Sequence, residues 1–172
     1  MSRLYRKLGH ALAAIAITGL SVGCTVMTET RTVETSDTYQ LWSDRMDRMP
    51  FLFHLPDGQL EAFDDHGHAW NAAASQVEAS DTDRVEVYLG SFSGLPTSLC
   101  EGKTQLSSTS ATTPNANVVS ALCDRSRTVV SFSDRARSKV LAARETYIAH
   151  TRHLLLNGIW KSVAQEPDPR PY

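Results

Sequence analysis

Alternation of apolar and polar residues is clearest near the middle of the chain. From Arg84 to Leu89, valine or leucine occupies every second position, and charged residues or tyrosine fill the others. Successive side chains of a strand point to opposite faces, so the pattern predicts a half-buried β-strand. Two pairs of short apolar runs, 51–55 with 59–63 and 118–123 with 128–132, flank polar turns of hairpin length. The sequence therefore predicts a small antiparallel sheet.

Apolar residues at helical spacing occur in three other segments. The first segment has a set three or four residues apart, ending before Pro50: Tyr39, Trp42, Met46 and Met49. A shorter helix is expected over 68–77, and a long one from about Asp134 to Val163. The long segment repeats its apolar residues every three or four positions: Val140, Leu141, Tyr147, Ile148, Leu154, Leu155, Ile159 and Val163. We therefore expect an α+β fold in which the long C-terminal helix covers the antiparallel sheet.

The predicted elements all fall between residues 38 and 166, which we interpret as a single α+β domain. Residues 24–37 are rich in threonine, glutamate and serine, and they carry too little apolar surface to order themselves, which predicts a tether. Residues 167–172 contain three prolines and are expected to form an extended tail.

The first 23 residues differ in character from the rest of the chain. Arg3, Arg6 and Lys7 give a positive start, and an apolar run from Ala11 to Leu20 follows. This run is shorter than the about 20 apolar residues that a transmembrane helix needs. The order of basic start, short apolar core and small residues is typical of an export signal that is removed.

The small residues Ser21, Val22 and Gly23 before Cys24 resemble the lipobox of bacterial lipoproteins, with serine where that family usually has leucine. The resemblance covers residues 1–24. It implies that Cys24 is acylated, becomes the new N-terminus and anchors the protein by lipid, facing the periplasm. Because residue 25 is threonine rather than aspartate, the resemblance implies the outer membrane. An ordinary secretory signal and an uncleaved membrane anchor remain as alternatives.

The chain contains three cysteines. Lipid on Cys24 would leave Cys100 and Cys123, and two cysteines of an exported protein can pair in an oxidising compartment. We therefore predict a disulfide between Cys100 and Cys123. The alternative is a pair of buried free thiols that pack as small apolar side chains.

Charged residues are distributed unevenly along the chain. The full chain has a formal charge of −2, and residues 1–23 hold three basic and no acidic side chains, so residues 24–172 carry −5. This charge argues against a general nucleic-acid role, which needs a basic surface. Residues 24–123 carry −9 and residues 124–172 carry +4. We interpret this asymmetry as packing of the basic C-terminal helix near the acidic first half; the alternative is a charged envelope partner.

The densest group of possible metal ligands lies between residues 54 and 68: His54, Asp57, Glu61, Asp64, Asp65, His66 and His68. No two of these histidines are four apart on a helix, as in zinc hydrolases, and the segment contains no calcium-type loop of oxygen ligands, so the favoured interpretation is a solvated acidic turn region. His150 and His153 share a helix face but lack a carboxylate partner in the pattern. The segment from Gly90 to Gly94 has Phe92 where a nucleophile elbow requires serine.

These observations favour a non-enzymatic protein. The resemblance implies a lipid-anchored envelope lipoprotein, and we expect an accessory component that binds an envelope protein, without a cofactor or a metal. The alternative is a small metal- or ligand-binding or hydrolytic domain that uses the acidic-histidine segment 54–68.

Overall fold

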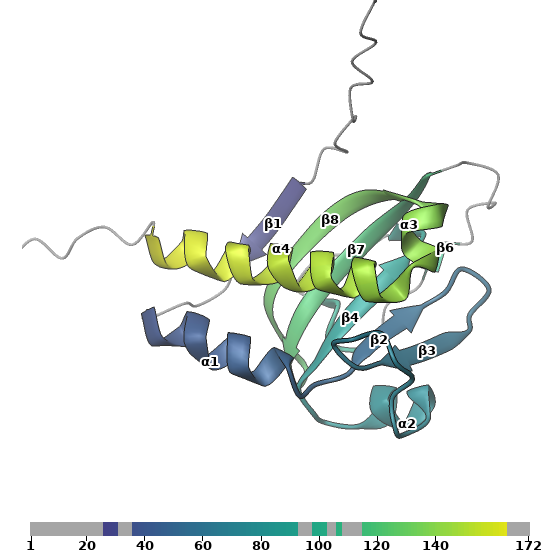
Figure 1. Cartoon of the computed structure of the whole chain (residues 1–172), viewed down its shortest axis with the longest axis horizontal. Coiled ribbons are helices and arrows are strands. Elements are labelled where there is room, and N and C mark those ends of the chain that lie inside the picture. The colour runs from purple at the N-terminus through teal and green to yellow at the C-terminus, as the bar shows by residue number, and fades with distance from the viewer. Residues whose placement is uncertain (1–25, 31–35, 93–97, 103–105, 108–114, 165–172) are drawn as a thin grey trace, which may run out of the picture.

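A computed structural model of the chain describes residues 26–30, 36–92, 98–102, 106–107 and 115–164 (Figure 1). The export segment, the lipobox and the proline-rich tail lie outside these described residues.

The centre of the domain is a six-stranded sheet. Its strands, in order across the sheet, are β1 (Val26–Thr30), β8 (Arg127–Arg137), β7 (Asn115–Asp124), β4 (Arg84–Leu89), β2 (Phe51–His54) and β3 (Leu60–Phe63). All neighbours are antiparallel except β2 and β4, which are parallel. The parallel pair follows from the connection after β3, which contains α2 (Ala74–Ala79) and returns the chain to the edge at which β2 began. Strands β5 (Ser91–Phe92) and β6 (Leu106–Ser107) form a separate short pair.

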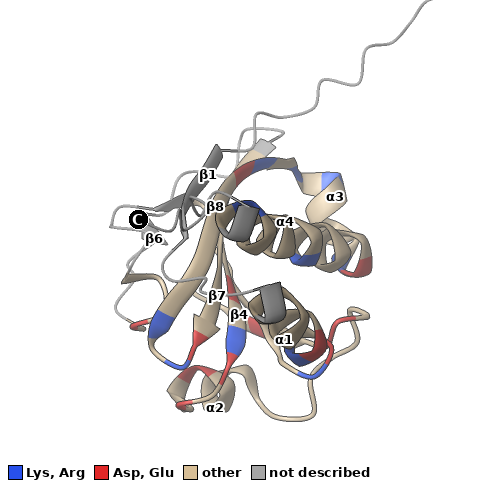
Figure 2. Cartoon of the chain, turned by 90° about the vertical axis from the view of Figure 1, so that its left-hand side faces the viewer, with Lys and Arg blue, Asp and Glu red and all other residues tan. Residues whose placement is uncertain are grey.

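Two helices cover one face of this sheet. α1 (Ser36–Met46) and α4 (Arg144–Ala164) lie side by side across it, as the two perpendicular views show (Figures 1 and 2). Their apolar faces and the facing strand residues form the main core, whose largest buried members include Trp42, Met46, Phe51, Phe53, Phe132, Tyr147, Ile148, Leu155 and Ile159. The predicted α+β fold with a covering C-terminal helix is confirmed, although the sheet is mixed. No helix in the described part of the chain is long and apolar enough to cross a membrane.

The predicted start of the C-terminal helix was wrong. Residues up to Arg137 continue β8, the short helix α3 (Ser138–Ala142) follows, and α4 begins only at Arg144. The reason is the length of the β7–β8 hairpin, in which Asn115 pairs with Arg137 and supplies the backbone hydrogen bonds that keep the segment extended.

Part of the expected tether is ordered. Residues 26–30 form β1, an edge strand on β8 in which Val26 pairs with Ser133. Amino-acid composition does not predict such a strand, because it forms through main-chain hydrogen bonds to the open edge of β8. These bonds need no large apolar side chain. The expected tether over 24–37 is therefore interrupted by β1, and α1 begins at Ser36.

The helix expected over 68–77 is also displaced, since α2 spans residues 74–79. A tight turn around Gly67 precedes it, and this turn lies against the start of α4. Gly67 has φ +80°, and a Cβ there would lie 2.8 Å from the backbone nitrogen of Glu145. Only glycine meets both the left-handed conformation and this close approach without strain.

Two ion pairs join α4 to the acidic first half of the chain. Arg144 binds Glu61 at 2.6 Å, and Arg152 binds Asp47 at 2.5 Å. Arg144 also lies over the rings of Phe53 and Phe63. The charge asymmetry of the sequence thus corresponds, in part, to packing of the basic helix on the first half of the chain.

Candidate functional site

Strand β4 carries a row of polar side chains on the face of the sheet away from the two long helices. Val85, Val87 and Leu89 point into the main core, so alternation places Arg84, Glu86 and Tyr88 on the other face. Only half burial was predicted for this strand, yet all six residues are buried. The difference arises because segment 98–102 lies over the second face and forms a smaller core with it: Tyr88, Leu99, Cys100, Val119, Ala121 and Cys123.

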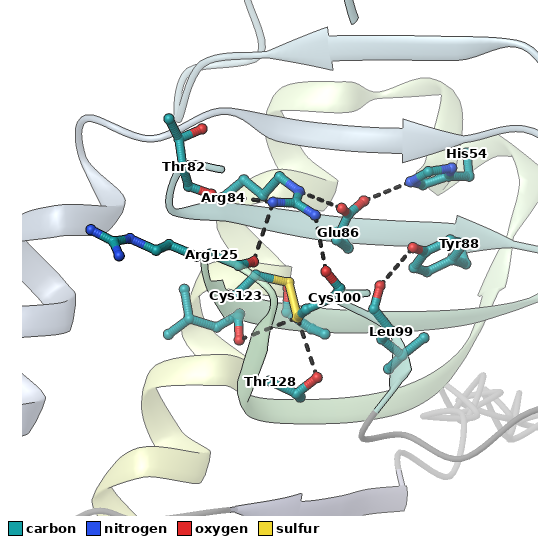
Figure 3. Close-up of a disulfide and its surroundings, with 12 residues drawn as sticks. His54, Thr82, Arg84, Glu86, Tyr88, Leu99, Cys100, Cys123, Arg125 and Thr128 are labelled. Atoms are coloured by element: carbon teal, nitrogen blue, oxygen red, sulfur yellow. Dashed lines mark hydrogen bonds and ion pairs between the residues drawn. A yellow bond between two sulfur atoms is a disulfide. The ribbon is translucent and has the colours of Figure 1, made fainter. Parts of the chain in front are cut away.

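Glu86 is the centre of a buried polar network, shown in Figure 3. One carboxylate oxygen accepts a hydrogen bond from Arg84 Nε at 2.5 Å, and the other lies 2.6 Å from His54 Nε2. The side chain of Glu86 is 1% exposed and that of His54 is 12% exposed. The imidazole of His54 stacks on the ring of Tyr88, with centroids 4.1 Å apart. The carboxylate charge is thus compensated inside the protein, as burial of an ion requires.

The same network attaches the covering segment to the sheet. The guanidinium of Arg84 donates to the carbonyl oxygens of Thr82, Arg125 and Cys100, each at 3.2 Å. The hydroxyl of Tyr88 donates to the carbonyl of Leu99 at 2.7 Å (Figure 3). Hydrogen bonds from two strand side chains therefore satisfy carbonyl groups that the covering segment buries.

A disulfide joins Cys100 to Cys123, with the Cα atoms 5.6 Å apart. This confirms the predicted pair. Cys123 lies on β7, whereas Cys100 lies in the turn of the covering segment. The hydroxyl of Thr128 on β8 lies 3.2 Å from the Cys100 sulfur. The disulfide and the polar network thus hold the same segment. We interpret their role as structural, because together they attach segment 98–102 to the sheet.

Sequence reasoning found the disulfide but missed the Arg84–Glu86–His54 network. The available signal was the pair Arg84 and Glu86, two residues apart in an otherwise apolar strand, which places opposite charges on one face. The sequence pattern groups His54 only with the possible metal ligands.

The possible metal ligands between residues 54 and 68 are distributed over separate parts of the domain. His54 binds Glu86 on one face of the sheet, whereas Glu61 binds Arg144 on the other. Asp57 accepts a hydrogen bond from the backbone of Gln59 within its own turn. In the described ranges of the chain, no group of three or more histidine, cysteine, aspartate or glutamate residues is placed to hold a metal ion.

Asp64 organises the turn that contains the two exposed histidines of this segment. Burial raises the pKa of the Asp64 carboxyl, but hydrogen bonds from the backbone N–H groups of His68 and His66 lower it more, so the pKa lies below its ordinary value of 3.8. The carboxylate therefore stabilises the folded turn above its ordinary pKa, and this contribution is lost as the pH falls through the lowered value. The rings of His66 and His68 point outward and remain exposed.

The other sequence candidates also occupy separate places. His150 packs near Tyr147 and lies 3.4 Å from the Asp134 carboxylate on β8, so the expectation that it lacks a carboxylate partner was wrong. His153 lines a surface groove. Burial, and then the nearby Asp134 carboxylate, raise the pKa of Tyr147 well above its ordinary value. Gly90 follows the end of β4 with φ 137°, and residues 93 and 94 lie outside the described residues.

An open groove of about 470 Å³ lies between α1 and α4 on the surface of the helical layer. Its lining residues are Tyr39, Ala149, Arg152, His153, Leu156, Asn157 and Trp160. Trp160 is 55% exposed and contacts Tyr39 edge to face, with ring centroids 5.9 Å apart. Arg152 joins the two helices across the groove, because it donates to the Ser43 carbonyl and binds Asp47. The groove thus combines the exposed Trp160 and the partly buried Tyr39 with polar groups on the two helices.

Comparison of the chain with protein-family models, curated proteins and solved structures gave no match.

Proposed function

We propose that this chain is a lipid-anchored envelope lipoprotein whose domain binds another envelope protein through the α1–α4 groove, without catalysing a reaction. The observation that carries the binding role is Trp160, a large apolar side chain that is 55% exposed and pairs with Tyr39 at the groove. Tryptophan and tyrosine are enriched among the residues that dominate binding energy at protein interfaces. The anchor is supported by the resemblance of residues 1–24 to a lipoprotein signal.

The geometry of the groove suits a protein segment with a projecting apolar side chain. Trp160 and Tyr39 offer apolar surface above the buried Leu156, and His153 and Asn157 offer hydrogen-bonding groups beside it. Arg152 contacts Ser43 of α1 and Asp47 just after it, so it joins α4 to this part of the chain, and we expect a partner to meet a preformed surface.

For the anchor, we expect a radiolabelled fatty acid to enter the protein at Cys24 in bacteria that express the full chain. Labelling should be lost in Cys24→Ala, and the variant should leave the membrane fraction, because acyl chains provide the attachment. The double variant Cys100→Ser/Cys123→Ser is the matched control and should keep the label. Equal labelling of wild type and Cys24→Ala would contradict lipidation at this residue.

For the groove, we expect a photo-crosslinking amino acid at position 160 to form a discrete adduct with one envelope protein in living cells. The same group at Ser126, exposed on the β7–β8 turn, should give no such adduct. Trp160→Ala should reduce recovery of the adduct partner by about 30-fold, the loss expected for an interface residue worth about 2 kcal/mol.

The crosslinking result has a clear negative form. If positions 160 and 126 gave the same adducts, or if Trp160→Ala left partner recovery unchanged, the α1–α4 groove would not be the binding surface. The anchor experiment is independent of this outcome, since it reads fatty-acid incorporation alone.

A further inference from the structure

The end of β8 and the following helix α3 carry a basic patch. Its members are Arg135, Arg137 and Lys139, all exposed; blue segments at the upper edge of Figure 2 mark this end of β8 and α3. Asp134 is the one acidic residue between positions 134 and 142, and its side chain is turned toward His150 and only 8% exposed. The three cations therefore have no carboxylate within their own segment that neutralises them at the surface.

The first strand begins next to the part of β8 that leads into this patch. Val26 pairs with Ser133, and because β1 and β8 are antiparallel, the start of β1 lies toward the end of β8 (Figure 1). Cys24 precedes Val26 by two residues. Two residues of extended chain span at most about 7 Å, so a lipid on Cys24 would be attached close to this edge of the sheet. The anchor and the basic patch would then share one end of the domain.

We propose that the basic patch of Arg135, Arg137 and Lys139 docks on the anionic phospholipid headgroups of the membrane that holds the anchor. This inference rests on the proposed lipidation of Cys24. A cationic surface on the end of the domain that carries the anchor is attracted to anionic lipid, and this attraction acts within about a Debye length, about 8 Å at physiological salt.

The shape of the patch agrees with such a partner. Val140 in α3 is 39% exposed next to Lys139, so an apolar side chain accompanies the three cations. Lysine and arginine carry long apolar stems that can lie along an interface while the charged groups contact headgroups. Docking in this way would give the domain one orientation on the membrane instead of free rotation about a tether.

The test uses the mature lipidated protein reconstituted into vesicles, with a fluorescent amino acid at Ser138 and a nitroxide quencher on lipid headgroups. We expect strong quenching in vesicles that contain phosphatidylglycerol, weak quenching in phosphatidylcholine alone, and loss of the difference at high salt. The triple variant Arg135→Gln/Arg137→Gln/Lys139→Gln should lower the ratio of docked to undocked protein by about 100-fold, roughly fivefold for each charge.

The matched control is Arg48→Gln/Arg125→Gln/Lys161→Gln, which removes three exposed charges elsewhere and should change the ratio less than twofold. If quenching did not depend on lipid charge, or if it fell equally in both triple variants, the proposed docking surface would be wrong, whereas the proposed anchor would be unaffected. If the purified protein carried no fatty acid and entered neither kind of vesicle, the anchor and this inference would both be wrong. Mass measurement of the purified protein separates the two failures before quenching is read.

Discussion

Replacing Glu86 with glutamine should lower the free energy of unfolding by about 3 to 5 kcal/mol, the usual cost of leaving one partner of a buried ion pair alone. The side chain of Arg84 is 4% exposed and that of Glu86 is 1% exposed, so water cannot replace the lost carboxylate. The variant also removes the charge that faces His54 Nε2 at 2.6 Å. Urea denaturation of the purified protein, compared with wild type, measures the change.

Two controls decide what such a loss means. Glu101→Gln changes an exposed carboxylate in the covering segment and should stay within about 0.5 kcal/mol of wild type. The double variant Arg84→Met/Glu86→Gln should cost less than the sum of the single variants, because no isolated charge is left. Additive losses would mean that the two side chains act independently, which contradicts the network.

Loss of the disulfide should have the second large effect. Cys100→Ser opens a loop with a sequence separation of 23 residues. Closing a loop of this size restricts the unfolded chain enough to stabilise the folded state by about 3 kcal/mol. Because a typical domain is stable by about 5 to 15 kcal/mol, the variant should show a clearly lower urea midpoint.

The second cysteine provides the test of mechanism. Once Cys100 is serine, adding Cys123→Ser should change stability by less than about 0.5 kcal/mol, since the bridge is already absent. Reduction of the wild-type protein should reproduce the loss. A double variant about 3 kcal/mol less stable than either single variant would show that each cysteine stabilises the fold by packing rather than by pairing.

The two predictions concern the same segment, and the structure explains why they should interact. Arg84 donates to the carbonyl of Cys100 at 3.2 Å, so loss of the bridge loosens the acceptor of this hydrogen bond. We therefore expect the Glu86 and Cys100 variants to be non-additive, as neighbouring changes usually are.

Local patterns predicted the elements whose side chains repeat with a clear period. The alternation in Arg84–Leu89, the two hairpins and the apolar stripe of the C-terminal helix all follow from how strands and helices direct their side chains. The cysteine count left Cys100 and Cys123 as the expected pair once Cys24 was assigned to the lipid, which is an inference from residue types and the expected oxidising compartment. Each of these inferences uses contacts close in sequence or a simple inventory.

Elements that depend on distant partners were missed or misplaced. β1 forms because β8 offers an open edge, and the last residues of β8 stay extended because β7 is long enough to pair with them. The parallel pairing of β2 with β4 depends on how the chain returns across the sheet, which no local period records.

The candidate sites show the same division. The sequence by itself determined the order of charges and apolar residues, the α+β class, and which cysteines could pair. Only the tertiary structure brought His54 to Glu86, separated it from Glu61 and Asp64, and placed Trp160 against Tyr39. The physical reason is that side-chain chemistry is carried by each residue, whereas a site requires residues distant in sequence to meet, and their meeting is decided by the packing of the whole sheet and its covering elements.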